Sequence, residues 1–352
     1  MVSLEIIRTF INYETDYEFE QYPLQVVNSE GIGPLTGIVD ISAGGNFSLA
    51  VNSDGFALAW GNNESYQLGD LTNYDRKTPV IVQRPEGDPL TDIVDISAGG
   101  GHAVARKSDG SVYVWGFNKW TEENPPRLGV DTEDLYVIGA YQVPGVSNVV
   151  KISTAGDDPS ILALKSDGTA LAWGNNFDGQ LCQETSEDVI ENPATVKGPG
   201  GEGNLTNITQ ISATLFYSLF LRSDGTVWGC VYNGYSSLAQ GTWEDYYLFP
   251  VQAKSPDEQG YLTNVANISK ETLAGNSFAI TSGNSVFAWG DNSLGQLGIG
   301  IYGINKNLPT PLLFAGYAIY SGNLNGEPLT GVSVGSENSE NLSFLVSPDG
   351  GN

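Results

Sequence analysis

Alternation of apolar and polar residues marks the first strand that the sequence predicts, at residues 38–42. This segment reads Ile-Val-Asp-Ile-Ser, and a period of two is typical of a half-buried β-strand. Ala43-Gly44-Gly45 interrupts the alternation, because glycine tolerates a tight bend. Two more apolar segments, residues 48–52 and 56–60, flank Ser53-Asp54-Gly55. We expect a hairpin there, since Asp-Gly supplies the two positive φ angles of a type I′ turn.

The same unit recurs along the chain. Its turn falls at residues 54, 109, 167, 224, 283 and 349, so successive copies lie 55 to 66 residues apart. A period of this size, with several strands in each unit, is typical of the blades of a β-propeller. We therefore predict one all-β domain over residues 1–352. Its repeats are expected to begin near residues 38, 93, 149, 208, 266 and 329.

The two ends of the chain are predicted to complete one blade together. The sixth copy stops at its hairpin turn and lacks two strands, whereas residues 1–37 hold a β-rich run at 4–11 and a proline-led run at 22–27. These N-terminal strands would close a six-bladed ring of four-stranded blades and protect its last sheet edges. The other fourth strands are also expected to open with a proline, as suits an edge strand. The prolines in question are Pro79, Pro193, Pro250 and Pro311, with blade two undecided between Pro126 and Pro144.

Tryptophan recurs at one position of the third strand, where a large ring can fill the gap between neighbouring sheets. The copies are Trp60, Trp115, Trp173 and Trp289. In the fourth repeat Cys230 takes this position. The only other cysteine is Cys182, and neither has a further Cys or His nearby to complete a metal set. We interpret both as free thiols of a reducing cell, with a disulfide as the alternative.

The chain is strongly acidic, with 15 Lys and Arg against 41 Asp and Glu and a formal charge of −26. Such a surface repels phosphate, so nucleic acid and anionic membranes are disfavoured as partners, while basic partners are favoured. The N-terminus lacks a basic start followed by an apolar run, and no apolar run is long enough to span a membrane. We expect no signal peptide, no membrane insertion and a protein made in the cytoplasm.

No set of residues predicts catalysis, a metal site or a cofactor. His102 is the only histidine, and its place at a repeat position predicts a hydrogen-bonded structural role. The acidic runs at residues 131–134 and 157–158 lack the spacing of a calcium loop. The glycine-rich runs at residues 99–101 and 198–201 lack the spacing of a phosphate loop. We therefore predict that the protein is not an enzyme. A propeller hydrolase would need clustered carboxylates, which distances alone can reveal.

Three long insertions, at residues 118–142, 241–261 and 300–320, carry aromatic residues. Aromatic side chains on long loops are typical anchors of protein contacts, and covering the edges of the blades is the alternative. The candidate binding residues are Trp120, Tyr136, Tyr141, Trp243, Tyr246, Tyr247 and Tyr302.

The repeated unit resembles the repeat of the regulator of chromosome condensation family. The shared positions of the first copy read Ile-Ser-Ala-Gly-Gly, Ser-Leu-Ala, Ser-Asp-Gly, Ala-Trp-Gly-Asn-Asn and Gln-Leu-Gly, and five copies match well. The resemblance implies a propeller whose faces bind partners. Members include a nuclear exchange factor for the GTPase Ran, domains of ubiquitin ligases and a secreted inhibitor of β-lactamases. The family ring commonly has seven blades, which is the alternative to the six counted here.

These observations favour a non-enzymatic binding or structural module whose propeller-face loops contact a protein or a surface glycan. The acidic composition, poor in Cys and Met, adds the hypothesis of a phage virion component at the capsid or tail surface, assembled into a larger particle. The alternative is an enzyme-regulating protein, either a guanine-nucleotide exchange factor or a protein inhibitor. A basic tail, expected of a chromatin-bound member of the family, is absent from this sequence.

Deleting residues 1–12 tests the predicted closure of the ring. Loss of the first N-terminal strand is expected to open the last blade and to lower the melting temperature sharply, as measured by scanning calorimetry. A melting temperature equal to that of the full chain would contradict this closure.

Overall fold

The computed structural model describes residues 24–132, 134–183, 185, 187–234, 236–243, 246–269, 275–312, 331–337 and 340–346. Within these residues the regular structure is β, apart from one 3₁₀ turn at Pro199–Gly201. The all-β prediction is therefore confirmed. The chain divides into two compact units, unit 1 (residues 1–159) and unit 2 (residues 160–352).

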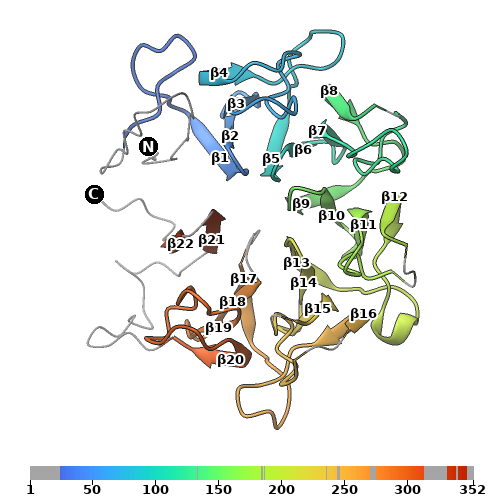
Figure 1. The fold of residues 1–352 in the computed structure, drawn as a ribbon, viewed down its shortest axis with the longest axis vertical. Helices are drawn as coiled ribbons and strands as arrows, with labels where there is room; N and C mark the ends of the chain where they lie inside the picture. Colours follow the sequence, from blue (N-terminus) through green and yellow to red (C-terminus); the bar gives the residue numbers. More distant parts are fainter. Residues whose placement is uncertain are drawn as a thin grey trace. The chain divides into compact units, whose positions relative to one another are not determined.

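Five sheets of four antiparallel strands follow one another along the chain, each a meander in sequence order (Figure 1). A two-stranded sheet comes last. The strands of the first two sheets are β1 (Ile38–Ala43), β2 (Phe47–Asn52), β3 (Ala57–Gly61), β4 (Arg76–Ile81), β5 (Ile93–Ala98), β6 (His102–Lys107), β7 (Val112–Phe117) and β8 (Tyr136–Gln142). The third and fourth sheets contain β9 (Val149–Ala155), β10 (Ser160–Lys165), β11 (Ala170–Asn175), β12 (Val189–Thr195), β13 (Ile208–Ala213), β14 (Tyr217–Arg222), β15 (Val227–Tyr232) and β16 (Tyr246–Gln252). The remaining strands are β17 (Val265–Ile268), β18 (Asn276–Thr281), β19 (Val286–Gly290) and β20 (Lys306–Pro311), followed by β21 (Gly331–Glu337) and β22 (Glu340–Val346).

Each meander has two kinds of end. Because consecutive strands are antiparallel, the first and third connections share one end, here termed the loop end. The second connection and the link to the next sheet share the other end. In unit 1 the first connections of neighbouring sheets touch, since Gly45 N donates to Gly99 O (3.2 Å). The third connections, residues 62–75 after β3 and 118–135 after β7, are much longer than the first connections.

The hairpin between β2 and β3 is not the type I′ turn that we expected. Gly55 has a φ of +80°, but Asp54 does not have a positive φ. Instead Gly55 N donates to Asn52 O (2.9 Å) and Asn52 N donates to Phe56 O (3.1 Å), which makes a longer turn that ends in a left-handed glycine. A Cβ atom on Gly55 would lie 3.2 Å from Asp92 Cα. Glycine is therefore also needed because the turn packs against the lead-in to the next sheet.

The prediction that a proline opens each fourth strand is wrong. Three of the named prolines (Pro79, Pro193 and Pro250) lie inside their strands and Pro311 ends β20, whereas Pro126 and Pro144 lie outside β8. Val80 of β4 pairs with Ala59 of β3, and Arg76 pairs with Gly61. The register therefore shifts by four residues on β4 and by two on β3, which makes a bulge that contains Pro79. A bulge on an edge strand tolerates a residue that has no N–H to donate. The corresponding bulges of β12, β16 and β20 contain Pro193, Pro250 and Pro309, while that of β8 contains Gly139.

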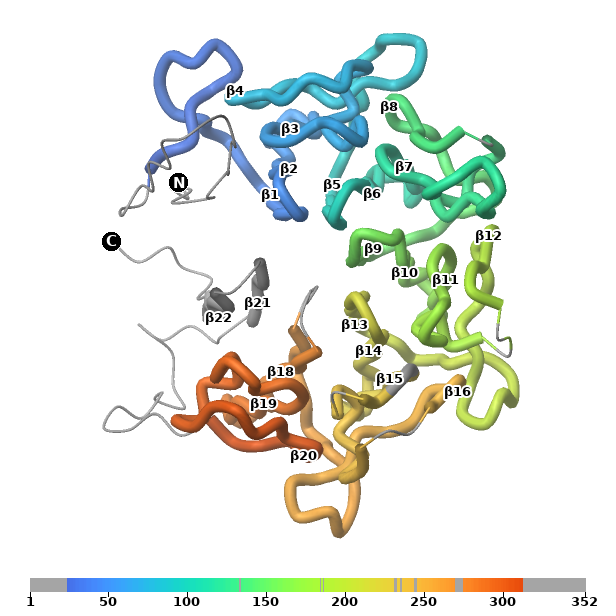
Figure 2. The backbone as a smooth tube through the Cα atoms, in the orientation of Figure 1, coloured from blue at the N-terminus to red at the C-terminus, as the bar shows by residue number. Residues whose placement is uncertain are grey.

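Polar side chains on the innermost strands join successive sheets in unit 1. Ser42 Oγ on β1 accepts a hydrogen bond from Ala98 N on β5 (2.9 Å), and Ser97 Oγ on β5 accepts one from Thr154 N on β9 (2.8 Å). A carboxylate two residues before each serine repeats the contact at 3.2 Å. These bonds satisfy strand N–H groups that the ladders within the sheets leave free. Figure 2 shows β1 beside β5 and β5 beside β9.

Each contact between successive sheets is here termed a joint. Further from the innermost strands, buried tryptophans fill these joints, as the sequence predicted. Trp115 on β7 is 0% exposed and donates from Nε1 to Gln67 O (2.8 Å) in unit 1. Trp289 on β19 is also 0% exposed and donates to Ser237 O (2.7 Å) in unit 2. An amide completes this second joint near the inner strands, since Gln210 Oε1 accepts from Ile268 N (3.0 Å).

The interpretation of the two cysteines as free thiols is wrong. Cys182 and Cys230 form a disulfide, with their Cα atoms 5.5 Å apart and both residues fully buried. The two are 48 residues apart in the sequence. The packing of one sheet on the next brings them together, which the spacing of the residues alone could not show.

The predicted closure falls outside the described residues, because residues 1–23 and the turn after β22 are not among them. In unit 2, β21 lies beside β17, as the next sheet in sequence should. Six blades, an N-terminal clasp and a single domain therefore stay predictions. Among the described residues, no helix has the length and apolar character needed to cross a membrane.

His102 begins β6 at the position that Phe47 and Tyr217 occupy in β2 and β14. Its side chain is fully buried, and Nε2 lies 2.6 Å from Thr154 Oγ1. Burial lowers the pKa of His102 from 6.5 to about 3, because the imidazolium would lose its hydration. The predicted structural role of His102 is thus confirmed.

Acid is expected to destabilise the protein through His102. Between pH 6.5 and about 3 the unfolded chain binds a proton that the folded histidine does not, so the free energy of unfolding falls as the pH drops through this window. From pH 7 to pH 4 the loss from this group is about 3 kcal/mol, since a tenfold change in proton affinity is about 1.4 kcal/mol. The variant His102→Phe, which copies Phe47, should lose this part of the pH dependence in urea titrations. Equal pH dependence of the two proteins would contradict the assignment.

Candidate functional site

A buried asparagine organises the long connection after each third strand. Asn118 Oδ1 accepts from Arg127 N (3.0 Å) and Leu128 N (3.1 Å), and its Nδ2 donates to Asp134 O (2.9 Å). One carboxamide thus ties together the start, the middle and the end of residues 118–135. We call this residue the base asparagine. Its counterparts are Asn63, Asn176, Asn233 and Asn292, all buried, and each accepts from the N–H of a leucine five residues later.

Four aromatic side chains gather at the loop end of unit 1. This aromatic cluster consists of Tyr66, Phe117, Trp120 and Tyr136. The ring centroid of Phe117 lies 4.7 Å from that of Trp120 and 6.3 Å from that of Tyr136, both edge to face. Tyr136 in turn lies 5.5 Å from Tyr66. Phe117 is buried, whereas Trp120 is 60% exposed, so the cluster presents an indole to solvent on a packed aromatic base.

A carboxylate from the neighbouring connection holds this indole in place. Trp120 Nε1 donates to Asp158 Oδ1 (2.7 Å), and Arg127 Nε lies 3.4 Å from the same oxygen. Asp158 belongs to the connection that follows β9, and Arg127 is buried beneath the loop. A large exposed side chain that is already held in one orientation loses little conformational entropy when a partner covers it. Such residues are typical hot spots of protein interfaces.

The charge exposed around the aromatic cluster is negative. The two basic residues of residues 118–132, Lys119 and Arg127, are only 1% and 7% exposed. The exposed acidic residues of the same connections are Glu122, Glu123, Asp131, Asp134 and Asp157. A cation can therefore approach the indole face with carboxylates around it, and both interactions are attractive.

The structure places the other predicted residues on separate connections and strands. In unit 1, Tyr141 lies on β8 and is 42% exposed. In unit 2, Trp243 (49% exposed) lies in the connection that leads into β16, and Tyr246 (65%) is the first residue of β16. Tyr302 is 80% exposed in the connection that follows β19. Tyr247 is half-buried against the core that contains Trp289, a position that suits the alternative of covering a blade edge.

Sequence reasoning missed Tyr66, Phe117, Arg127 and Asp158. Tyr66 directly precedes the repeated Gln-Leu pair, and that position could have been compared between copies. Asp158 belongs to the acidic run at residues 157–158, which lacks the spacing of a calcium loop. Among the described residues, no group of three or more His, Cys, Asp or Glu side chains could hold a metal ion.

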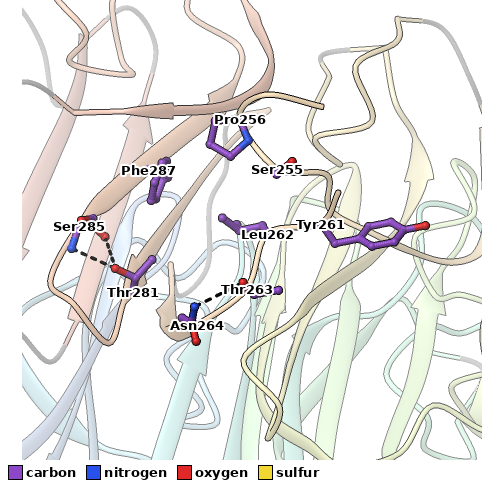
Figure 3. Close-up of a pocket in the computed structure, with 9 residues that line it drawn as sticks. All are labelled: Ser255, Pro256, Tyr261, Leu262, Thr263, Asn264, Thr281, Ser285 and Phe287. Atoms are coloured by element: carbon purple, nitrogen blue, oxygen red, sulfur yellow. Dashed lines mark hydrogen bonds between the residues drawn. The ribbon is translucent and has the colours of Figure 1, made fainter. Parts of the chain in front are cut away.

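A cavity of about 290 Å³ lies in unit 2, at the opposite end of the sheets from the loop end (Figure 3). Its hydrogen bonds stay within its wall, where Ser285 N donates to Thr281 Oγ1 (3.1 Å), and Tyr261 points away from it. No acidic or basic side chain lines the cavity, so it offers no general acid–base pair. The lining residues are Ser255, Pro256, Tyr261, Leu262, Thr263, Asn264, Thr281, Ser285 and Phe287.

Comparison with known families agrees with the repeat. The model of the regulator of chromosome condensation (RCC1) repeat matches residues 54–106 and 284–339. A second model of the same repeat matches residues 38–67.

Curated proteins with related sequences are longer than this chain. Human E3 ubiquitin-protein ligase HERC2 is 27% identical over 302 residues, which cover 86% of this chain and 6% of HERC2. The ultraviolet-B receptor UVR8 of Arabidopsis thaliana is 31% identical over 285 residues, which cover 77% of this chain and 57% of UVR8. The chain thus spans less than two thirds of the length of either relative.

Two solved structures share the fold. Human WBSCR16 superposes with a TM-score of 0.69 at 21% identity, covering 91% of this chain and 75% of that protein. Prp20p of Saccharomyces cerevisiae, whose structure was described together with its binding to Gsp1p and histones, superposes with a TM-score of 0.63 at 22% identity. That alignment covers 79% of this chain and 63% of Prp20p. At these identities the likeness concerns the fold, and it confirms the predicted propeller class.

Replacing the base asparagine tests how the loop end is built. Asn118→Ala removes three hydrogen bonds and leaves the buried N–H groups of Arg127 and Leu128 without their acceptor. We expect a loss of about 2–4 kcal/mol in the free energy of unfolding and a more mobile Trp120, measured by urea titration and fluorescence anisotropy. The control is Asn124→Ala, whose carboxamide makes only exposed bonds to Thr121 in the same connection. Equal stability of the two variants would contradict this role.

Proposed function

Because this chain belongs to the regulator of chromosome condensation repeat family of β-propellers, we propose that it is a protein-binding module whose partner docks on the aromatic cluster at the loop end of unit 1. The observation that carries the proposal is the exposed indole of Trp120, which Asp158 holds in a fixed orientation. The long connection that bears this indole is anchored from below by Asn118 and Arg127. The binding surface is therefore preformed, which favours affinity.

The chemistry of the surface favours a basic partner. An exposed indole on connections that carry exposed carboxylates suits an Arg or Lys side chain, which can stack on the ring and pair with the acids. The chain as a whole carries a formal charge of −26, which speeds the approach of a cationic partner. Salt screens this electrostatic attraction, so binding should weaken as the salt concentration rises. The description of Prp20p as a protein that binds Gsp1p and histones supports a protein partner for a propeller of this kind.

The regulation of an enzyme is one form of this binding function. No described contact favours an exchange factor over an inhibitor, so we propose neither in particular. The ligase activity named for HERC2 is not carried over, because the aligned part is 6% of that protein. The hypotheses of a surface glycan and of a virion component gain no support from the relatives or from the aromatic cluster, and we do not propose them.

Titration with defined basic probes tests the proposed function. The probes are an arginine-rich peptide and purified core histones, with an acidic peptide of equal length as the negative probe, followed by Trp fluorescence and calorimetry at low and high salt. We expect salt-sensitive binding of the basic probes. Trp120→Ala should weaken it at least about tenfold, the effect of a hot-spot residue. Asp158→Asn should weaken it less, because it frees the indole without removing it.

The matched control is Tyr261→Ala, which removes an exposed aromatic side chain (57% exposed) from the opposite end of the sheets. It should bind the basic probes as the unmodified chain does, and circular dichroism should show all variants folded. Failure of the basic probes to bind, or equal affinity of Trp120→Ala and Tyr261→Ala, would overturn the proposal.

A further inference from the structure

Two joints between successive sheets share one arrangement around a buried tryptophan, here termed the wedge. Trp115 and Trp289 occupy equivalent places on β7 and β19, since they pair with the second residues of β6 and β18. Each donates its indole N–H to a carbonyl in the third connection of the preceding sheet, that of Gln67 or Ser237. The wedge thus closes the joint by volume and by one buried hydrogen bond.

The wedge requires a small residue two positions after that carbonyl. At the Trp115 joint this residue is Gly69, where an added Cβ would lie 3.0 Å from Trp115 Nε1 and 3.1 Å from its Cδ1. At the Trp289 joint it is Ala239, which packs in the same core as the indole. A side chain larger than alanine would compete with the indole for the same space.

The joint between the third and fourth sheets departs from both parts of this rule. Cys230 on β15 pairs with Ser218, the second residue of β14, so it stands at the tryptophan position. The residue two positions after Gln180, where Gly69 and Ala239 stand in the other joints, is Cys182. The leucine between them, Leu181, donates to its base asparagine as the equivalent leucines do, which fixes the correspondence.

The two residues that depart from the rule are bonded to each other. Cys182 and Cys230 are joined by a disulfide, are both 0% exposed, and lie with their Cα atoms 5.5 Å apart within unit 2. Cys230 Sγ lies 3.6 Å from Gln180 O, the carbonyl equivalent to the one that accepts from the indole elsewhere. At this joint, two cysteines occupy the positions that a tryptophan and a small residue occupy at the other two joints.

We propose that the Cys182–Cys230 disulfide is a redox-sensitive clasp that replaces the wedge between the sheet containing β10–β12 and the sheet β13–β16. Oxidation of the two thiols releases two protons and two electrons, which a small disulfide such as oxidised glutathione accepts. Reduction by a dithiol runs through a mixed disulfide and ends with two protein thiols and the cyclised reductant. Two thiols fill less space than an indole and donate weaker hydrogen bonds, so the reduced joint is the weakest of its kind.

Burial of both sulfurs gives the clasp a second property. A thiolate must reach a sulfur atom in line with the bond, so the joint has to open before exchange can occur. The folded protein should therefore resist a dithiol at room temperature and should lose the bond quickly near its melting transition. This coupling makes the bond a reporter of the opening of one joint.

Thermal melting of the unmodified chain with and without dithiothreitol is the first test. Alkylation of the unfolded, unreduced protein should label no cysteine, and reduction should lower the melting temperature by about 3–6 °C, as expected for the loss of a disulfide in a chain of this size. Labelling of both cysteines before reduction, or an unchanged melting temperature after it, would overturn the proposal without any variant.

Variants then test whether the disulfide stands in for the wedge. Cys182→Ser should melt like the reduced protein. The double variant Cys182→Gly with Cys230→Trp, which copies Gly69 and Trp115, should melt above Cys182→Ser and should not respond to dithiothreitol. A double variant that melts at or below Cys182→Ser would show that the two arrangements are not equivalent and would overturn the replacement.

Discussion

Hydrogen-bonding groups at the joints between sheets must find partners in the next sheet, because no ladder within a sheet reaches them. Ser42 and Ser97 meet this need near the inner strands, and the indole N–H of Trp115 meets it further out. A buried donor or acceptor without a partner costs about 1–3 kcal/mol, so these contacts allow one alignment of each sheet on the next and disfavour others. That alignment decides which connections lie together at the loop end.

The repeat, the strands and the tryptophans could be predicted because each rests on local pattern or on fixed spacing. A period of two identifies a strand whatever it packs on, and tryptophan at one position of several copies indicates one packing role. The turn at Ser53-Asp54-Gly55 was placed correctly but given the wrong geometry, since Asp54 does not take the positive φ that a type I′ turn requires. The bulges around Pro79 were missed because they depend on the register between two strands, which proline alone does not specify.

The candidate site was predicted only in part, because some of its contacts join residues that are far apart in the sequence. Trp120 and Tyr136 could be named from their place on a long insertion, and both belong to the aromatic cluster. Asp158, which orients the indole, comes from the next sheet, and nothing near it in the sequence points to Trp120. Tyr247, like Tyr246, is an aromatic residue on a long insertion. It packs against the core, however, because alternate residues of a strand face opposite ways. The disulfide was missed for the same reason as Asp158.

The base asparagines carry a consequence for how such a protein can diversify. Each closes its connection at the root with a single carboxamide, as Asn118 does for residues 118–135 and Asn292 does for its shorter counterpart. The exposed residues between these anchors, such as Thr121 and Glu122, make few contacts with the sheets, so they can vary more freely than the anchored backbone groups. Segments of different length and composition can then replace one another in these connections while the sheets stay the same. Grafting a foreign recognition segment between Asn118 and Arg127 would use the same freedom.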